Sequence, residues 1–272
     1  MSKYLQTLLL FIVLSTLIFL AYRSYDDANK YIQTTKEISS LNNTDQAIQK
    51  KVDQFLEELS MGLYKGYTKN SNYLDGLSTK AVFYHERSID YLYYFFGTVV
   101  VFIILFALLD IDLLYIFIGL SALIALITAL FSPLLIMTVF KSFPVIGEVT
   151  LSYESKSIYG TISKLYHHSN YLVGTLVLLF SVLIPLVKSL FIALYGFIKE
   201  TGFANNLAKT IEKIGKWSMA DVFIVAVLVV FFSTKQDIHT SLKIEVGLYF
   251  FAGYVLLSIL GSSLLGRKKQ EV

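Results

Sequence analysis

The sequence predicts an all-α polytopic membrane protein with six transmembrane helices. Hydrophobic residues make up 55% of the chain and charged residues only 16%, and the mean hydropathy is +0.62. These values lie outside the range of a soluble domain. The chain also contains apolar runs that are each close to or above the roughly 20 residues a helix needs to cross about 30 Å of hydrocarbon. The six runs are Tyr4–Tyr22, Tyr91–Leu109, Leu113–Phe140, Tyr171–Ile198, Ser218–Thr234 and Val246–Leu265.

The first run, in residues 1–22, is expected to remain as a membrane anchor. It is long for a secretory signal, and no small-residue cleavage pattern follows Arg23. The basic residues of the short loops favour both termini in the cytoplasm, with eight inside and five outside. The inside set is Lys3, Lys199, Lys209, Lys213, Lys216, Arg267, Lys268 and Lys269, and the outside set is Lys141, Lys156, Lys164, Lys235 and Lys243. Residues 267–272 form a basic cytoplasmic tail.

Residues 23–90 are predicted to form an extracytoplasmic helical insert between the first two spans. An apolar stripe recurs in it at helical spacing, which predicts an amphipathic helix. This set, termed here the apolar stripe, is Ile48, Val52, Phe55, Leu56, Leu59 and Leu63. The stripe either packs against a second helix of the insert, or it docks a partner or senses a ligand. Residues Lys69–Lys80 are rich in Asn, Ser, Tyr and Gly and are predicted to form a loop.

The second span, in residues 91–112, ends in a tight cytoplasmic turn at Asp110–Asp112. The third and fourth runs are about 42 Å long at 1.5 Å per residue, more than the hydrocarbon thickness. Pro133 and Pro185 are therefore expected to kink them, because proline removes a backbone donor and clashes with the preceding turn. Between these runs, Ile158 and its apolar neighbours predict a short amphipathic helix at the membrane interface.

Lys188 lies inside the apolar run Tyr171–Ile198. An ionisable side chain at the bilayer centre costs about 2.5–3.5 kcal/mol on insertion scales, so such a residue indicates a partner or a function. The cytoplasmic end of its helix, at Lys199, is roughly three helical turns away, which is far for the amine to reach water. Asp221 opens the next run and either pairs with Lys188 or caps a helix N-terminus near Trp217.

Small residues and residues with hydroxyl groups also interrupt the third, fourth and fifth apolar runs. Ser181 and Lys188 are seven residues apart, with Pro185 between them, so they share one helix face. Helices packed around a common polar surface would satisfy such groups mutually, although hydroxyls are also ordinary contacts between membrane helices. The whole set, termed here the polar seam, is Lys188, Asp221, Ser181, Ser218, Pro185, Trp217, Ser121, Thr128 and Ser132.

Two segments match a family pattern. Residues 215–223 have the sequence GKWSMADVF, and residues 180–188 have the sequence FSVLIPLVK. The first resembles the W-S-M-x-D-V-F signature of the paraquat-inducible protein A family, inner-membrane proteins of the PqiA and LetA types. The second is similar to that family's segment ending in P-x-x-K. The resemblance covers about Leu113–Leu265, and the two motifs together are fairly specific.

The resemblance implies that residues 113–266 form one four-helix, tetraspanin-like module in the inner membrane of a diderm bacterium. It implies lipid movement between the two membranes beside an MCE-domain periplasmic partner. The motif lysine and aspartate carry over to Lys188 and Asp221, and the motif serines to Ser181 and Ser218. Well-studied members have two modules and cysteine-rich zinc ribbons, whereas this chain is a single-module form with no cysteine. A homo-oligomer could restore a double module.

Composition excludes several other functions. With no cysteine, the chain has no disulfide or cysteine-ligated zinc, and its four histidines lie at no metal-ligand spacing, so no metal or cofactor is expected. A net charge of +3 is too small to indicate nucleic acid. The leading hypothesis is a non-enzymatic protein that handles membrane lipid at the polar seam and helps to maintain the envelope. The alternative is a membrane sensor or stress-response protein that uses the insert. An intramembrane enzyme has no supporting motif.

Overall fold

The computed structural model describes residues 3–42, 44–61, 63–143, 147–198, 210 and 240–268. Five of the described helices are long and apolar enough to cross a membrane, which confirms the polytopic membrane fold. The sixth predicted span, Ser218–Thr234, lies outside the described residues. The helices are α1 (Lys3–Leu41), α2 (Thr44–Leu59), α3 (Gly66–Leu109), α4 (Ile111–Phe131), α5 (Ile158–His167), α6 (Tyr171–Leu178), α7 (Ile184–Ile198) and α10 (Val246–Lys268), with a π-helical turn η1 (Leu179–Leu183) between α6 and α7. The strands are β1 (Leu135–Phe143), β2 (Gly147–Lys156) and β3 (Thr240–Ile244).

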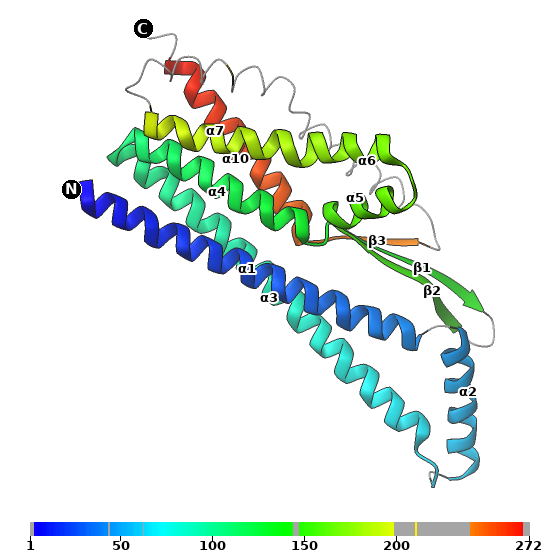
Figure 1. Cartoon of the computed structure of the whole chain (residues 1–272). Helices are drawn as coiled ribbons and strands as arrows, with labels where there is room; N and C mark the ends of the chain where they lie inside the picture. The colour runs from blue at the N-terminus through cyan, green and yellow to red at the C-terminus, as the bar shows by residue number, and fades with distance from the viewer. Residues whose placement is uncertain are drawn as a thin grey trace.

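Helix α4 lies at the centre of the bundle, with α1 and α3 on one side and α7 and α10 on the other (Figure 1). It is buried along most of its length, as expected of a helix that is apolar on all sides. Aromatic side chains fill the core around it, with the rings of Phe106 and Phe117 centred 5.2 Å apart and those of Phe95 and Phe250 also 5.2 Å apart. The tight turn before α4 is confirmed, because the Asp110 side chain caps the helix by accepting from the Asp112 N–H at 2.8 Å.

Helices α1 and α3 continue well beyond the membrane-spanning bundle and carry α2 at their far end (Figure 1). The predicted loop at Lys69–Lys80 is wrong, because α3 begins at Gly66 and runs through this segment. Its packing against α1 outweighs the weak helix propensity of the Asn, Ser and Gly residues, and Leu77 and Ala81 are buried there. The predicted amphipathic helix of the insert is confirmed as α2. Residues 23 and 90 both lie within continuous helices rather than at helix ends.

Pro133 ends a helix instead of kinking one, which corrects the expectation of a single span over Leu113–Phe140. Helix α4 stops at Phe131, and Ser132 adopts an extended conformation with φ −72° and ψ 152°, the conformation that a following proline favours. The chain then enters a small antiparallel sheet with strand order β2-β1-β3. This sheet was not predicted, since the apolar residues of β1 continue the apolar run of α4.

The sheet packs against the extended parts of α1 and α3 through a small separate core of Tyr31, Ala81 and Ile136. Next to it lies the predicted short amphipathic helix, confirmed as α5, with Ile158 and Ile162 buried. The end of the bundle that carries the sheet is termed here the sheet end. It is the same end from which α1 and α3 project (Figure 1).

Candidate functional site

Lys188 lies in α7 with only 5% of its surface exposed, and it is engaged with a neighbouring group. On the same helical run, Gly174 and Ser181 are also buried, whereas Val187 and Leu190 are exposed. One side of the run therefore faces lipid, and the predicted face of small and polar residues faces the protein. An amine in this position is kept away from both water and lipid, which is costly without a compensating interaction.

The helix that carries Lys188 is irregular next to the lysine. Residues Leu179–Leu183 form the π-helical turn η1, and Pro185 stands in the first turn of α7. Because proline has no N–H and crowds the carbonyl one turn before it, a regular α-helix cannot pass through this position without strain. The π turn accommodates the missing donor, and such turns are frequent at functional sites. Pro185 therefore distorts the span, in line with the sequence prediction.

A buried polar layer connects α7 to α10 at the same level. The Pro185 carbonyl accepts from the Ser189 hydroxyl at 3.0 Å and from the Tyr254 hydroxyl at 3.4 Å. Tyr254 and Ser258, one turn apart on α10, are both buried. The sequence analysis of the seam missed Ser189, Tyr254 and Ser258. The last two are four residues apart in an apolar run, and this spacing could have indicated a polar face.

Glycine allows α4 to approach α7 closely beside this layer. A Cβ placed on Gly119 would lie 2.7 Å from the Cα of Ala193, and one placed on Gly196 would lie 2.7 Å from the carbonyl oxygen of Asp112. Small residues at such crossings let membrane helices pack backbone to backbone. The helix that bears Lys188 is thereby held tightly against the central helix.

The remaining residues of the polar seam differ in their hydrogen bonding, and three of them lie outside the described residues. The Ser121 and Thr128 hydroxyls donate to carbonyls of their own helix, to Ile118 at 3.2 Å and to Ile124 at 2.9 Å. The Ser132 hydroxyl is buried without a hydrogen-bond partner among the described residues. The positions Trp217, Ser218 and Asp221 lie outside the described residues. The pairing of Asp221 with Lys188 therefore stays a prediction.

A second buried ionisable group, Glu245, lies where β3 meets α10. Its side chain is 0% exposed, and neither carboxylate oxygen has a hydrogen-bond partner within the described part of the chain. The nearest basic nitrogens there are His85 Nδ1 at 3.5 Å and Lys243 Nζ at 4.0 Å. Glu245 directly precedes the first residue of α10, where the helix dipole favours a negative charge.

Aromatic side chains enclose Glu245 and its basic neighbours. The Lys243 amine donates to the Tyr31 hydroxyl at 3.0 Å, and the Tyr31 ring lies 4.8 Å from the His85 ring. Tyr153 of β2 is part of the same surroundings, and burial raises the pKa of its phenol, so this side chain stays neutral. Sequence reasoning missed Glu245, because a charge just outside an apolar run is ordinary. Its basic neighbours among the described residues come from α3 and β3, His85 and Lys243.

Among the described residues, no group of three or more His, Asp or Glu side chains is arranged to hold a metal ion. The structure thus presents two buried ionisable positions, Lys188 within the spans and Glu245 at the sheet end. Both lie in the region that comparison with known families picks out. The family model of paraquat-inducible protein A matches residues 115–269, more than half of the chain.

The chain belongs to the paraquat-inducible protein A family. The region matched by the family takes in nearly all of α4, the sheet, α5, α6, α7 and α10, whereas α1, α2 and α3 precede it. Lys188, Tyr254 and Glu245 all fall inside the match. No curated protein and no solved structure gave a match. The matched region, residues 115–269, is termed here the family core, and the long N-terminal hairpin of α1, α2 and α3 lies outside it.

Proposed function

We propose that this protein handles membrane lipid at the polar seam of its family core, without catalysing a chemical reaction. The observation that carries the proposal is the burial of Lys188 at membrane depth. A buried amine can pair with a carboxylate of the chain or with an anionic lipid headgroup, and alternation between the two partners would give the core two states. Asp221 is the proposed carboxylate, on the strength of its position in the family motif.

The proposed setting is the inner membrane of a bacterium with two membranes, in a system that maintains the envelope. Both termini are proposed to lie in the cytoplasm, which places the sheet end and α2 in the periplasm. The proposed partner is an MCE-type periplasmic protein, and a homo-oligomer could bring two cores together. Exposure of the apolar stripe supports a docking role for α2, since Phe55 is 61% and Leu59 is 64% exposed.

Complementation of a null strain by a Lys188→Ala variant tests the function. The variant should reach normal levels in the membrane but fail to restore the envelope barrier against detergents and hydrophobic antibiotics. Val187→Ala is the matched control, because it truncates the neighbouring lipid-facing side chain and should complement fully. Full complementation by Lys188→Ala would show that the lysine has no role in function.

A further inference from the structure

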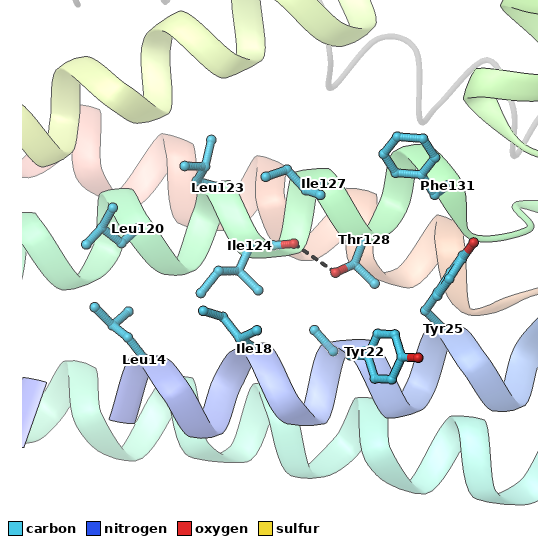
Figure 2. Close-up of a pocket in the computed structure, with 11 residues that line it drawn as sticks. Leu14, Ile18, Tyr22, Tyr25, Leu120, Leu123, Ile124, Ile127, Thr128 and Phe131 are labelled. Atoms are coloured by element: carbon cyan, nitrogen blue, oxygen red, sulfur yellow. Dashed lines mark hydrogen bonds between the residues drawn. The ribbon is translucent and has the colours of Figure 1, made fainter. Parts of the chain in front are cut away.

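An apolar groove runs between α1 and α4, away from Lys188. It is an open groove with a volume of about 600 Å³. Figure 2 shows side chains of the two helices facing one another across it, with Ile18 opposite Ile124. The lining residues lie between Leu14 and Tyr25 on α1 and between Leu120 and Phe131 on α4. Because α1 precedes the family match, the groove is formed between the family core and the N-terminal hairpin.

The groove opens to hydrocarbon, since both of its walls are membrane-spanning helices. It extends from Leu14 to Tyr25 on α1 and from Leu120 to Phe131 on α4, which is about 17 Å at 1.5 Å per residue. One leaflet contributes about 15 Å of the hydrocarbon core. Phe131 and Tyr25 lie at the same end of the groove (Figure 2), and α4 leads from Phe131 into the sheet. The groove therefore spans the leaflet on the sheet side.

The lining side chains are almost all apolar, as expected of a site that binds a lipid acyl chain. Away from the two tyrosines at one end, Thr128 is the one lining residue with a hydroxyl, and it donates to the Ile124 carbonyl of its own helix at 2.9 Å. A hydrocarbon ligand would thus leave the Thr128 hydroxyl satisfied. The tyrosines Tyr22 and Tyr25 lie toward the sheet end, at the depth where aromatic residues meet lipid headgroups.

The length of the groove distinguishes a lipid from a membrane-spanning helix of another chain. Such a helix needs an apolar contact surface of about 30 Å, the thickness of the hydrocarbon core. The groove is lined only from Leu14 to Tyr25 on α1 and from Leu120 to Phe131 on α4, the depth of one leaflet. We propose that this groove holds one or both acyl chains of a membrane lipid from the sheet-side leaflet. The groove lies between α1 and α4, whereas Lys188 lies on α7; Thr128 of the polar seam also lines the groove. This inference does not depend on the proposed function.

Photo-crosslinking tests the proposal on the full chain in nanodiscs that contain a phosphatidylethanolamine with a diazirine in mid-chain. Mass spectrometry should find adducts concentrated on residues 14–25 and 120–131. Ile18→Trp and Ile127→Trp fill the groove from opposite walls and should each reduce these adducts several-fold. Ile12→Trp is the matched control, because Ile12 is an equally exposed isoleucine of α1 outside the groove (53% against 57% for Ile18). It should leave them unchanged.

The other outcomes overturn the proposal. Adducts spread evenly over other lipid-facing positions such as Ile104, and unaffected by either tryptophan, would mean ordinary surrounding lipid only. Disulfide-linked dimers of an Ile18→Cys variant, with few adducts in the groove, would mean that a second copy of the chain fills it. Lys188→Ala should not change the labelling of the groove. The groove experiment can therefore succeed even if Lys188 turns out to bind no lipid. Thermal unfolding of each variant checks that it is folded.

Discussion

Glu245 is the described residue whose surroundings make the clearest energetic prediction. It is a fully buried carboxylate with basic nitrogens at 3.5 Å and 4.0 Å and no hydrogen bond among the described residues. Removing one partner of a buried charge pair typically costs about 3–5 kcal/mol, because the other charge is left uncompensated. The distances here are long, and Lys243 is half exposed, so we expect the low end of that range for Glu245→Ala.

Thermal and denaturant unfolding in detergent measure this loss. Glu245→Gln keeps the shape of the side chain and should cost less than Glu245→Ala. Glu154→Gln is the control, because Glu154 is a half-exposed carboxylate of the same sheet with two lysines at 3.5 Å. Exposed pairs of this kind contribute about 0–1 kcal/mol. Equal effects of Glu245→Ala and Glu154→Gln would contradict the interpretation of Glu245 as a buried charge.

Lys188 and Glu245 also show what the sequence can reveal about single residues. Lys188 could be predicted to be buried because it interrupts an apolar run, where the hydrocarbon itself supplies the energetic argument. Glu245 stands before such a run, and its burial depends on His85 and Tyr31, which are distant in the chain. No local pattern carries that information.

At the scale of helices, the contact of α4 with α7 depends on Gly119. A methyl group there would lie 2.7 Å from the Cα of Ala193, which is closer than real contacts allow. Gly119→Ala should therefore lower the free energy of unfolding by about 1–3 kcal/mol, the usual cost of overpacking. Gly97→Ala on α3 is the control, because a Cβ there meets no described atom within 4 Å. It should be neutral or stabilising by up to about 1 kcal/mol. A neutral Gly119→Ala in thermal unfolding would argue against this close packing.

The exposure of the apolar stripe of α2 predicts how substitutions in it affect stability and partner binding. Its side chains are exposed rather than packed on a second helix, so replacing Phe55 and Leu59 together by Ser should change stability little, within about 0.5 kcal/mol per site. The same double variant should weaken co-purification with an MCE-type partner. A large loss of thermal stability with partner binding retained would mean that the stripe is internal packing.

The elements differ in how far the sequence could predict them. Helices α2 and α5 were predicted from their periodicity, and the turn at Asp110 from its charge between two apolar runs. The segment Lys69–Lys80 was predicted wrongly, because its residues favour a loop locally and only packing on α1 makes it helical. The sheet was missed because the apolar residues of α4 and of β1 form one continuous apolar run across Pro133, and a short apolar strand cannot be distinguished from a helix by composition.

For the whole molecule, the charge distribution predicts that both termini lie in the cytoplasm and the sheet end in the periplasm. The chain has no cysteine, so a single Cys introduced at position 270 can be labelled without background. It should be protected from an impermeant maleimide in intact spheroplasts and react after permeabilisation. A Cys introduced at Met61, near the tip of the long hairpin, should react in intact spheroplasts. Labelling with the opposite pattern would invert the proposed topology.

The role proposed for Lys188 is to bind the headgroup of an anionic lipid in the family core. This binding can be measured by native mass spectrometry of the purified full-length protein, titrated with phosphatidylglycerol after delipidation. The wild-type protein should retain the anionic lipid, Lys188→Ala should lose it several-fold, and Lys188→Arg and Val187→Ala should keep it, because the positive charge and not the bulk of the helix holds the headgroup. Equal retention of phosphatidylglycerol by the wild-type protein and Lys188→Ala would show that Lys188 does not hold the lipid.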